Sequence, residues 1–277
     1  MTNPKSVLIL STGRTGTMFL ANYLRDIVPN SLVFHEAGER SRLINVLANA
    51  HLAGFVPYSF PRWAWTRIVA RDLAGYDREY YIDSNNQLYG LSPKLKELYP
   101  NLKIVHIVRD PRSYVRSHIN WSQHRLKSYI ANHLTPFWQP SGYFHGNYRF
   151  IDWARIDPVE RYAWIWNYKN MLIEQSALKK TEYLRIRFED LFGLNNRIRY
   201  FNKILNFIGV AEVERLEDKF HHAANPNKSD AFPSWETWDK EKCLILESVC
   251  GALMRRYGYG NENAWKTKIS NFKGGEA

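Results

Sequence analysis

The stretch LILSTGRTGTMFLANYL, residues 8–24, decides the fold that this sequence predicts. It begins with apolar residues typical of a strand, ends with apolar residues at helical spacing, and has small and polar residues between them. A strand that turns directly into a helix brings backbone N–H groups and the positive helix end together, and this arrangement binds anions. We therefore predict a strand at 7–10, a helix at 17–25 and an anion-binding loop between them.

The loop differs from the phosphate loop of nucleotide hydrolases. Gly13 and Gly16 allow the backbone to approach a ligand closely. The hydrolase pattern reads GxxxxGK[ST], whereas here only two residues separate the glycines and no lysine follows the second one. ATP or GTP hydrolysis is therefore disfavoured. A strand-to-helix turn without a ligand is the alternative for so short a pattern.

The rest of the chain continues an alternation of strands and helices, which is typical of a parallel sheet covered by helices. The further predicted strands are 31–34, 80–82, 103–108 and 183–188, and the further helices are 41–51, 92–98, 113–121, 159–177 and 240–257. A chain of 277 residues with 45% apolar content can form one elaborated α/β domain. We expect one domain over 1–277, three-layered with helices on both faces of a mostly parallel sheet. An irregular, aromatic-rich insertion is expected at about 122–157.

Composition limits the partners and the location. The formal net charge of +11 indicates an anionic ligand or acceptor, a nucleic acid or an acidic membrane surface, without choosing among them. No apolar stretch is long enough to cross a bilayer and no leader pattern opens the sequence, so a cytoplasmic location is expected. Cys243 and Cys250 lie seven positions apart in a helical pattern, which favours core packing over a disulfide.

A second strand-to-helix segment, KIVHIVRDPRSYVRS at 103–117, also indicates an anion site. The strand ends at Arg109, and Ser117 lies on the following helix, with Arg112 and Arg116 on a neighbouring face. Ligands of open α/β sheets bind at the carboxyl ends of the strands. Two such sites in one sheet therefore suggest a ligand that carries phosphates at two separated positions.

The combination of the lysine-free STGRTGT loop with VRDPRSYVRS, in which Arg109 and Ser117 are eight positions apart, resembles the sulfotransferase family. This family binds 3′-phosphoadenosine 5′-phosphosulfate (PAPS). The resemblance extends to YLRIRFEDLF at 183–192 and to MRRYGY at 254–259, so it spans nearly the whole chain. Many soluble members have lysine where this chain has Arg14, whereas the protein-tyrosine and several bacterial branches have arginine.

The resemblance implies a P-loop-like α/β fold in which the first loop holds the 5′-phosphosulfate and the second segment holds the 3′-phosphate. The residues implied at the 5′ end are Gly13, Arg14, Thr15, Gly16, Thr17 and Met18, and those at the 3′-phosphate are Arg109 and Ser117. The segment NPNKSDAFPSWETW at 225–238 is similar to a loop that closes on the cofactor in relatives, which adds Lys228 and Ser229. Phe19 or Trp235 could stack on adenine, although core packing is favoured for Trp235.

The chemistry of sulfuryl transfer assigns roles to three residues. Charge develops on the leaving oxygen, so positioning and electrostatic stabilisation do most of the catalysis, as in phosphoryl transfer. Arg14 suits the leaving phosphate because it stays protonated and presents a planar fork of donors. The acceptor hydroxyl needs a base, for which Glu36 is the leading candidate and His35 the second. A surface turn with a satisfied histidine is the alternative reading of this pair.

Two segments are candidates for acceptor binding. The third strand ends in Asp83 and Asn85, which could face the acceptor or serve only as cap and turn residues. The insertion contains TPFWQPSGYFHGNYRFIDW, in which Trp138 and Tyr143 could stack on a sugar or shelter a lipid. A self-packed surface loop is the alternative for this insertion.

The sequence therefore predicts a sulfotransferase that uses PAPS, transfers the sulfuryl group in line to a carbohydrate or glycolipid hydroxyl, and releases adenosine 3′,5′-bisphosphate (PAP). The resemblance implies in-line transfer without an obligatory metal. Zinc binding through the pattern HExxH is excluded separately, because Glu39 occupies the place of the second histidine. The predicted partners are a saccharide or lipid-linked acceptor and an anionic membrane surface, but not nucleic acid. A P-loop kinase that uses ATP and magnesium is the alternative, which Asp83 after a strand favours and the missing GK[ST] opposes. A non-catalytic binder of nucleic acid or of an anionic surface requires only the charge.

Overall fold

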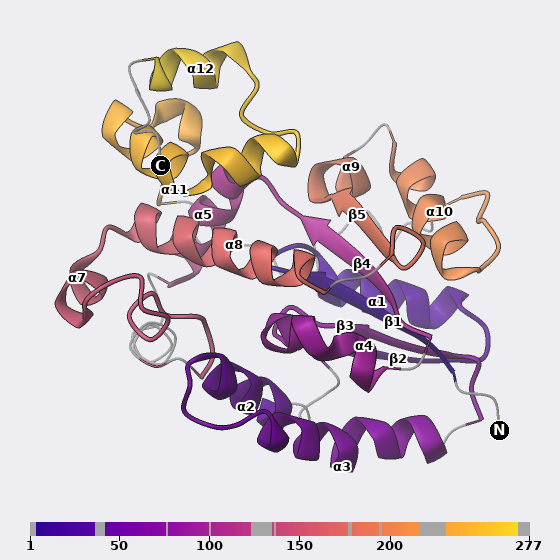
Figure 1. Ribbon diagram of the computed structural model, residues 1–277. Coiled ribbons are helices and arrows are strands. Elements are labelled where there is room, and N and C mark those ends of the chain that lie inside the picture. Colours follow the sequence, from indigo (N-terminus) through magenta and orange to yellow (C-terminus); the bar gives the residue numbers. More distant parts are fainter. Residues whose placement is uncertain are drawn as a thin grey trace.

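A computed structural model of the chain shows a five-stranded sheet with helices around it (Figure 1). The structure describes residues 4–36, 42–75, 77–99, 101–122, 135, 137–176, 179–193, 196–215 and 231–270. The strands are β1 (Lys5–Ser11), β2 (Ser31–His35), β3 (Tyr80–Ser84), β4 (Lys103–Val108) and β5 (Tyr183–Arg187). Their order is β2-β3-β1-β4-β5, and every neighbouring pair is parallel. The predicted α/β fold with a parallel sheet is confirmed.

Both faces of the sheet are buried, which explains why its strands are continuously apolar. In β1, Val7 and Ile9 pack on one face against α1 (Thr17–Ile27), α9 (Phe188–Phe192) and α10 (Arg197–Ile208). Leu8 and Leu10 pack on the other face. The helices over that face are α2 (Arg42–Leu52), α3 (Ser59–Gly75), the 3₁₀ helix η2 (Leu88–Lys94), α4 (Leu95–Leu98) and α8 (Pro158–Glu174).

A third apolar cluster lies beyond the carboxyl end of β4 and includes its last residue, Val108. It joins α8 to α5 (Pro111–Ser122), α7 (Phe150–Arg155), α11 (Lys240–Arg256) and α12 (Asn263–Ile269), which lie together in Figure 1. Cys243 and Cys250 are buried free thiols in this cluster, as their spacing predicted. The large side chains of Trp153, Trp166 and Trp265 fill it.

Several helices were not predicted from the sequence, and the reasons differ. In α3, Phe60 and Trp63 are exposed while Ala64 and Trp65 are buried, so apolar residues surround the helix and no single stripe indicates it. By contrast, α10 buries apolar residues at helical spacing, a pattern that the analysis overlooked. The short α12 was also missed. The predicted helix 92–98 is divided between η2 and α4, because Pro93 lacks the N–H that an α-helix would use there.

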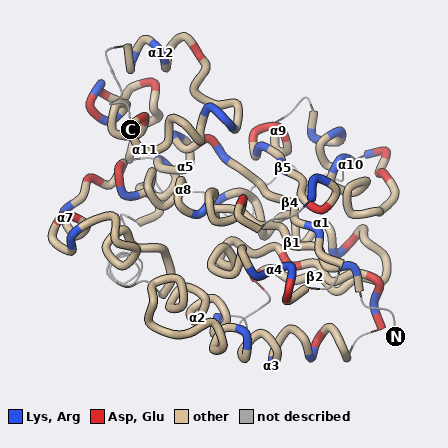
Figure 2. Tube along the Cα trace, in the orientation of Figure 1, with Lys and Arg blue, Asp and Glu red and all other residues tan. Residues whose placement is uncertain are grey.

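The parallel arrangement places the ends of β1, β2, β3 and β4 at one edge of the sheet, where the loops that follow them meet. Basic and acidic residues are spread over the trace rather than confined to one side of it (Figure 2). Among the described helices, none is both long and apolar enough to cross a membrane.

Candidate active site

The loop between β1 and α1 has an unusual backbone that leaves a helix end open. Three of its residues have left-handed φ angles, namely Gly13 at 97°, Arg14 at 58° and Gly16 at 70°. Ser11 Oγ holds the turn by accepting hydrogen bonds from the backbone N of Gly13 at 3.2 Å and from Thr15 Oγ1 at 2.7 Å. Helix α1 has neither a side-chain cap nor an acidic residue in its first turn. Its first N–H groups therefore remain suited to an anion from outside the helix.

Side chains of the loop divide between the interior and the surface. Thr15 is fully buried and Thr17 nearly so, which means that these residues would meet a ligand through their backbone N–H groups. Met18 is exposed at the start of α1. A Cβ atom on Gly16 would lie 2.4 Å from Cζ of Phe192, so this position has no room for a side chain. Phe192 ends the YLRIRFEDLF segment, and the contact therefore joins two of the segments that carried the resemblance.

The two predicted phosphate-binding segments are directly bonded to one another. Arg109 Nη1 donates to the backbone O of Arg14 at 2.5 Å, and Arg14 Nε donates to Ser117 Oγ at 3.2 Å. The Arg109 guanidinium lies over the ring of Phe188, 4.7 Å from its centroid, and its Nε has no hydrogen-bond partner among the described residues. Burial lowers the pKa of Arg109, and the charge of Glu189 opposes this shift. Two arginines, a serine and an open helix end therefore form one cationic site.

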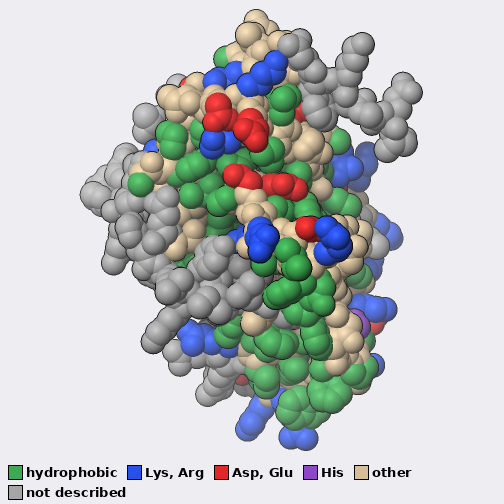
Figure 3. Space-filling view, turned by 90° about the vertical axis from the view of Figure 1, so that its left-hand side faces the viewer, with side chains coloured by type: hydrophobic (Ala, Val, Ile, Leu, Met, Phe, Trp, Pro, Cys, Tyr) green, Lys and Arg blue, Asp and Glu red, His purple; other side chains and the backbone are tan. Residues whose placement is uncertain are grey.

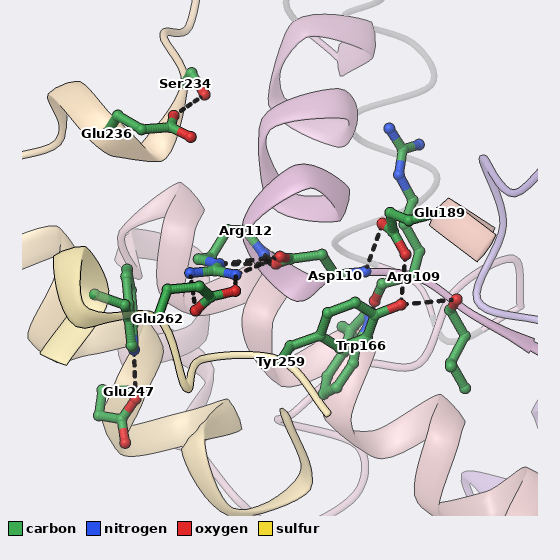
Figure 4. Close-up of polar contacts among 12 residues, drawn as sticks. Arg109, Asp110, Arg112, Trp166, Glu189, Ser234, Glu236, Glu247, Tyr259 and Glu262 are labelled. Carbon is green, nitrogen blue, oxygen red and sulfur yellow. Dashed lines mark hydrogen bonds and ion pairs between the residues drawn. The ribbon is translucent and has the colours of Figure 1, made fainter. Parts of the chain in front are cut away.

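A buried frame holds Arg109 in position (Figure 4). Trp166 Nε1, on α8, donates to the backbone O of Arg109 at 2.9 Å. The backbone N of Asp110 donates to Glu189 Oε1 at 3.1 Å, and the Tyr259 hydroxyl donates to Glu189 Oε2 at 2.5 Å. Burial raises the pKa of Glu189. The segments 183–192 and 254–259, which carried part of the resemblance, thus meet at Arg109 and Asp110, within the strand-to-helix segment 103–117.

Arg112, which the sequence places on the face next to Ser117, is directed into the protein interior. It is buried and pairs with Asp110 at 2.5 Å and with Glu262 at 2.8 Å (Figure 4). Its guanidinium lies between the rings of Trp235 and Trp265, 4.3 and 5.1 Å from their centroids. The Arg112 guanidinium is therefore paired with two carboxylates of the protein itself. Trp235 packs on this arginine, as the favoured packing role predicted.

The predicted bases His35 and Glu36 lie beside the first loop. His35 Nε2 is 3.3 Å from Thr17 Oγ1, and burial lowers the pKa of His35 while Glu36 opposes the shift. Glu36 Oε1 accepts a hydrogen bond from Asn86 Nδ2 at 2.6 Å. Glu36 also has a left-handed φ of 54°, and such backbone strain in a residue other than glycine is concentrated at functional sites. At neutral pH His35 is in its neutral form, which can accept a proton.

Lys169, on α8, is a titratable group of this region that the sequence analysis missed. Its side chain is fully buried, and its Nζ lies 4.4 Å from the centroid of the Tyr89 ring with no hydrogen-bond acceptor among the described residues. Burial lowers its pKa to about 7, and the charge of Glu36 opposes the shift. A lysine on a helix face otherwise lined by Ile165 and Ile173 was the signal in the sequence that could have revealed it.

Asp83 and Asn85 have structural partners at the end of β3. Both are fully buried, and Asn85 Nδ2 donates to Asp83 Oδ2 at 3.1 Å. Asn85 Oδ1 accepts from the backbone N of Gln87 at 2.9 Å, which closes the turn into η2. The turn-forming role is thus present, and contact of these residues with an acceptor stays a prediction.

The described part of the insertion is packed on itself and anchored to α2. Asn49 Nδ2 donates to the backbone O of Phe137 at 2.8 Å. Trp138 and Tyr143 are each 40% exposed, and Tyr143 packs against Phe144 and Phe150. Trp138 and Tyr143 are thus accessible at the surface, and the prediction that they contact the acceptor molecule stays a prediction.

Two predicted cofactor residues, Lys228 and Ser229, lie outside the residues that the structure describes. Within the described ranges, no group of three or more histidine, cysteine, aspartate or glutamate side chains is arranged to hold a metal ion. The described edge therefore combines two kinds of chemistry. The loops and arginines can hold anionic groups, and His35, Glu36 and Lys169 can move or stabilise a proton.

Comparisons with known proteins agree with this arrangement. A family model described as "Sulfotransferase family" matches residues 35–214, which is more than half of the chain. The solved sulfotransferase from Alicyclobacillus acidocaldarius is 12% identical with a TM-score of 0.51, and the match covers 96% of this chain and 100% of that one, which shows a shared fold. The sulfotransferase domain from the curacin biosynthetic pathway is 13% identical with a TM-score of 0.46, over 96% of each chain. No curated protein matches. With its matching sequence region, its parallel sheet and its two joined loops, the chain belongs to the sulfotransferase family.

Proposed function

We propose that this protein transfers the sulfuryl group of PAPS to a hydroxyl group of a carbohydrate or glycolipid and releases PAP. The observation that carries the proposal is the direct bonding of Arg14 to both Arg109 and Ser117. It joins the predicted 5′ and 3′ anion sites into one site, which suits a donor with phosphates at both ends. The reduced thiols of Cys243 and Cys250 are consistent with a cytoplasmic location.

The residues of the loops fit the anionic groups of PAPS. The open first turn of α1 and the left-handed backbone at Gly13 offer N–H groups to the 5′ end. Arg109, whose Nε has no hydrogen-bond partner among the described residues, and Ser117 offer donors to the 3′-phosphate. PAPS supplies the activated sulfuryl group when bound. Lys228 and Ser229 are proposed to complete the 3′ side.

Arg14 is proposed to stabilise the departing phosphate. It keeps its proton throughout the reaction, so it acts by charge and by its planar set of donors rather than as an acid. Its bond to Ser117 and the bond that its carbonyl accepts from Arg109 tie the predicted 5′ loop, which carries Arg14, to the predicted 3′ segment. The left-handed φ of 58° at Arg14 indicates that the fold maintains this position at some cost in stability.

On the acceptor side, Glu36 is proposed to take the hydroxyl proton, with His35 as the alternative base. Asn86 orients the Glu36 carboxylate, and Thr17 links His35 to the first loop. The charge of Glu36 acts on the buried Lys169, whose pKa it raises against the effect of burial. Asp83, Asn85, Trp138 and Tyr143 are proposed to contact the rest of the acceptor.

Ligand-induced thermal stabilisation tests the donor. PAP is expected to raise the melting temperature of the wild type, since a ligand that binds only the native state stabilises it. The Arg109→Ala variant should lose most of this shift. The Arg199→Ala variant is the matched control, because Arg199 is exposed on α10, away from both loops. Stronger stabilisation by ATP with magnesium would favour the kinase alternative, and stabilisation by DNA alone would favour a nucleic-acid binder; either result contradicts the proposal.

Sulfuryl transfer itself can be followed with sulfur-35-labelled PAPS and a panel of saccharides, glycolipids and cell extracts. The wild type is expected to label an acceptor that carries a free hydroxyl group. The Arg14→Ala variant should lower the rate by about a hundredfold or more, the typical effect of removing a group that stabilises transition-state charge. Turnover near the wild-type rate in this variant would exclude the leaving-group role of Arg14.

A further inference from the structure

Large apolar side chains are exposed in two segments that are distant in sequence. Phe55, Phe60 and Trp63 lie in and before the start of α3, and each is at least half exposed. Tyr143 lies in the insertion, and Phe150 and Ile151 lie at the start of α7, with Ile151 61% exposed. We call these six residues the aromatic surface. Its members are more numerous and larger than the isolated apolar side chains that ordinary surfaces carry.

Ring contacts connect the two segments of the aromatic surface. The ring centroids of Phe55 and Phe144 are 5.3 Å apart, and those of Phe144 and Tyr143 are 4.9 Å apart. The ring of Tyr143 in turn packs against Phe150 at 5.4 Å. On α3, Phe60 and Trp63 are three positions apart and so share a side of the helix. The ring contacts therefore join Phe55 to Tyr143 and Phe150, and Phe60 and Trp63 follow Phe55 within eight positions of the chain.

The space-filling view shows hydrophobic side chains gathered over the lower half of one face (Figure 3). This face is the left-hand side of Figure 1, where α7 lies and toward which the arrowhead of β4 points. The predicted base Glu36 follows β2 at the carboxyl edge, and α2 begins soon afterwards at Arg42. The aromatic surface is therefore on the same side of the molecule as the candidate active site.

The charges in the α2–α3 part of the aromatic surface are almost all positive, whereas beside Phe150 and Ile151 the exposed Arg149 pairs with Asp152. Between residues 42 and 75 the chain has Arg42, Arg62, Arg67 and Arg71 but a single acidic residue, Asp72. The four arginines are exposed and make no ion pair within the described residues. Arg62 lies directly between Phe60 and Trp63 in the sequence.

This mixture of exposed aromatic rings and arginines without acidic partners is characteristic of a protein surface that binds an anionic bilayer. Phenylalanine and tryptophan enter the boundary between head groups and acyl chains, and arginine binds the phosphates above them. A second copy of the chain is a poorer partner, because a symmetric contact would bring these arginines against one another. The cores of protein interfaces are also depleted of charged residues.

We propose that the aromatic surface seats this protein on an anionic lipid bilayer, so that the carboxyl edge of the sheet meets the hydroxyl group of a lipid-linked acceptor at the membrane. The proposal that the protein binds the bilayer depends only on the exposed apolar residues and arginines described above. The identity of the acceptor as lipid-linked rests on the proposed function.

Co-sedimentation with vesicles tests the seating. The wild type should bind vesicles of phosphatidylcholine with 30% phosphatidylglycerol, about tenfold or more tightly than vesicles of phosphatidylcholine alone, and less tightly as salt increases. The double variant Phe60→Ser/Trp63→Ser should bind anionic vesicles about tenfold more weakly, because it loses apolar area that enters the bilayer. The double variant Arg62→Glu/Arg67→Glu should lose the preference for anionic vesicles.

The matched control is Arg199→Glu/Lys203→Glu, which makes the same change of charge on exposed residues of α10, over the opposite face of the sheet. This control should bind vesicles as the wild type does. Equal loss in the control would reduce the effect to net charge and overturn the proposal, as would equal binding of the wild type to both kinds of vesicle. A dimer in light scattering that Phe60→Ser/Trp63→Ser converts to a monomer would assign the surface to self-association instead.

Thermal stabilisation by PAP separates this inference from the proposed function. The variants of the aromatic surface should keep the PAP-induced shift, which also shows that they are folded. If the wild type binds PAP but does not bind vesicles, the proposed membrane binding is refuted and the proposed function is not. Vesicle binding by a wild type that does not respond to PAP would refute the proposed function and leave the seating intact.

Discussion

Replacement of Lys169 by methionine offers a direct measure of what a buried charge costs this fold. Lys169 is fully buried, and its Nζ has no hydrogen-bond acceptor among the described residues. Methionine has a similar length and flexibility but no charge, so it can fill the same space beside Tyr89. We expect Lys169→Met to be more stable than the wild type at neutral pH and less active in sulfuryl transfer. A gain in stability with a loss of activity is characteristic of groups kept for function.

The magnitude follows from the pKa of Lys169, which burial lowers from 10.5 to about 7. Because the unfolded chain binds the proton more tightly, the lysine destabilises the native state. The cost is complete below about pH 7, where both states are protonated, and it decreases as the pH rises toward 10.5. At about 1.4 kcal/mol for each pH unit between the two values, it amounts to about 5 kcal/mol in acid and about 4 kcal/mol at pH 7. The pKa of about 7 already includes the attraction to Glu36, and loss of the contact with the Tyr89 ring would reduce the net gain by about 1 kcal/mol.

Urea unfolding followed by tryptophan fluorescence at pH 6, 7.5 and 9.5 measures this difference. The advantage of Lys169→Met over the wild type should be largest at pH 6 and should shrink steadily toward pH 9.5. Lys203→Met is the control, because Lys203 is exposed on α10 and its removal should change stability little at any pH. A variant that is less stable than the wild type at pH 6, or an advantage that does not change with pH, would refute this account of Lys169.

Three further predictions concern the loops and the frame. Gly16→Ala should destabilise the protein by about 1–3 kcal/mol more than Gly54→Ala in thermal unfolding, because both have left-handed φ angles but only the first would place a Cβ against an aromatic ring; equal losses would show that the ring moves aside freely. Arg112→Met should cost about 3–5 kcal/mol in urea unfolding, since it leaves a buried carboxylate without its partner, and a neutral result would contradict the structural role of this arginine. Glu36→Gln should lower the rate of sulfuryl transfer about a hundredfold or more and His35→Ala should lower it less, while unchanged rates in both would remove the assignment of the base.

Much of the architecture could be predicted from the sequence because it depends on local patterns. The strand and turn at the start of the chain, the strand that leads to Arg109 and the apolar stripe of the last long helix each appear within about 20 residues. Such patterns specify elements and their order, and parallel strands then place their carboxyl ends at one edge. The two anion loops were predicted in this way, and the structure joins them through Arg14.

The roles of individual charged residues could be predicted less well. Arg112 and Arg109 are three positions apart and of the same type, yet one is enclosed between two tryptophan rings and the other is directed toward the first loop. Arg112 pairs with its near neighbour Asp110 and also with Glu262, which lies 150 positions away. Lys169 likewise acquires its low pKa from burial in the completed fold, where it lies beside the ring of Tyr89 on η2.

The sequence by itself determined the parallel sheet, the two loops predicted to bind anions and the membership of a family. Only the tertiary structure decided which arginine remains available to a ligand, that Lys169 is buried close enough to Glu36 to feel its charge, and that exposed rings from two distant segments lie on the side of the active site. The physical reason is the range of the interactions. Hydrophobic periodicity and turn formation act between near neighbours in the chain, whereas desolvation and charge pairing depend on what the completed fold brings together.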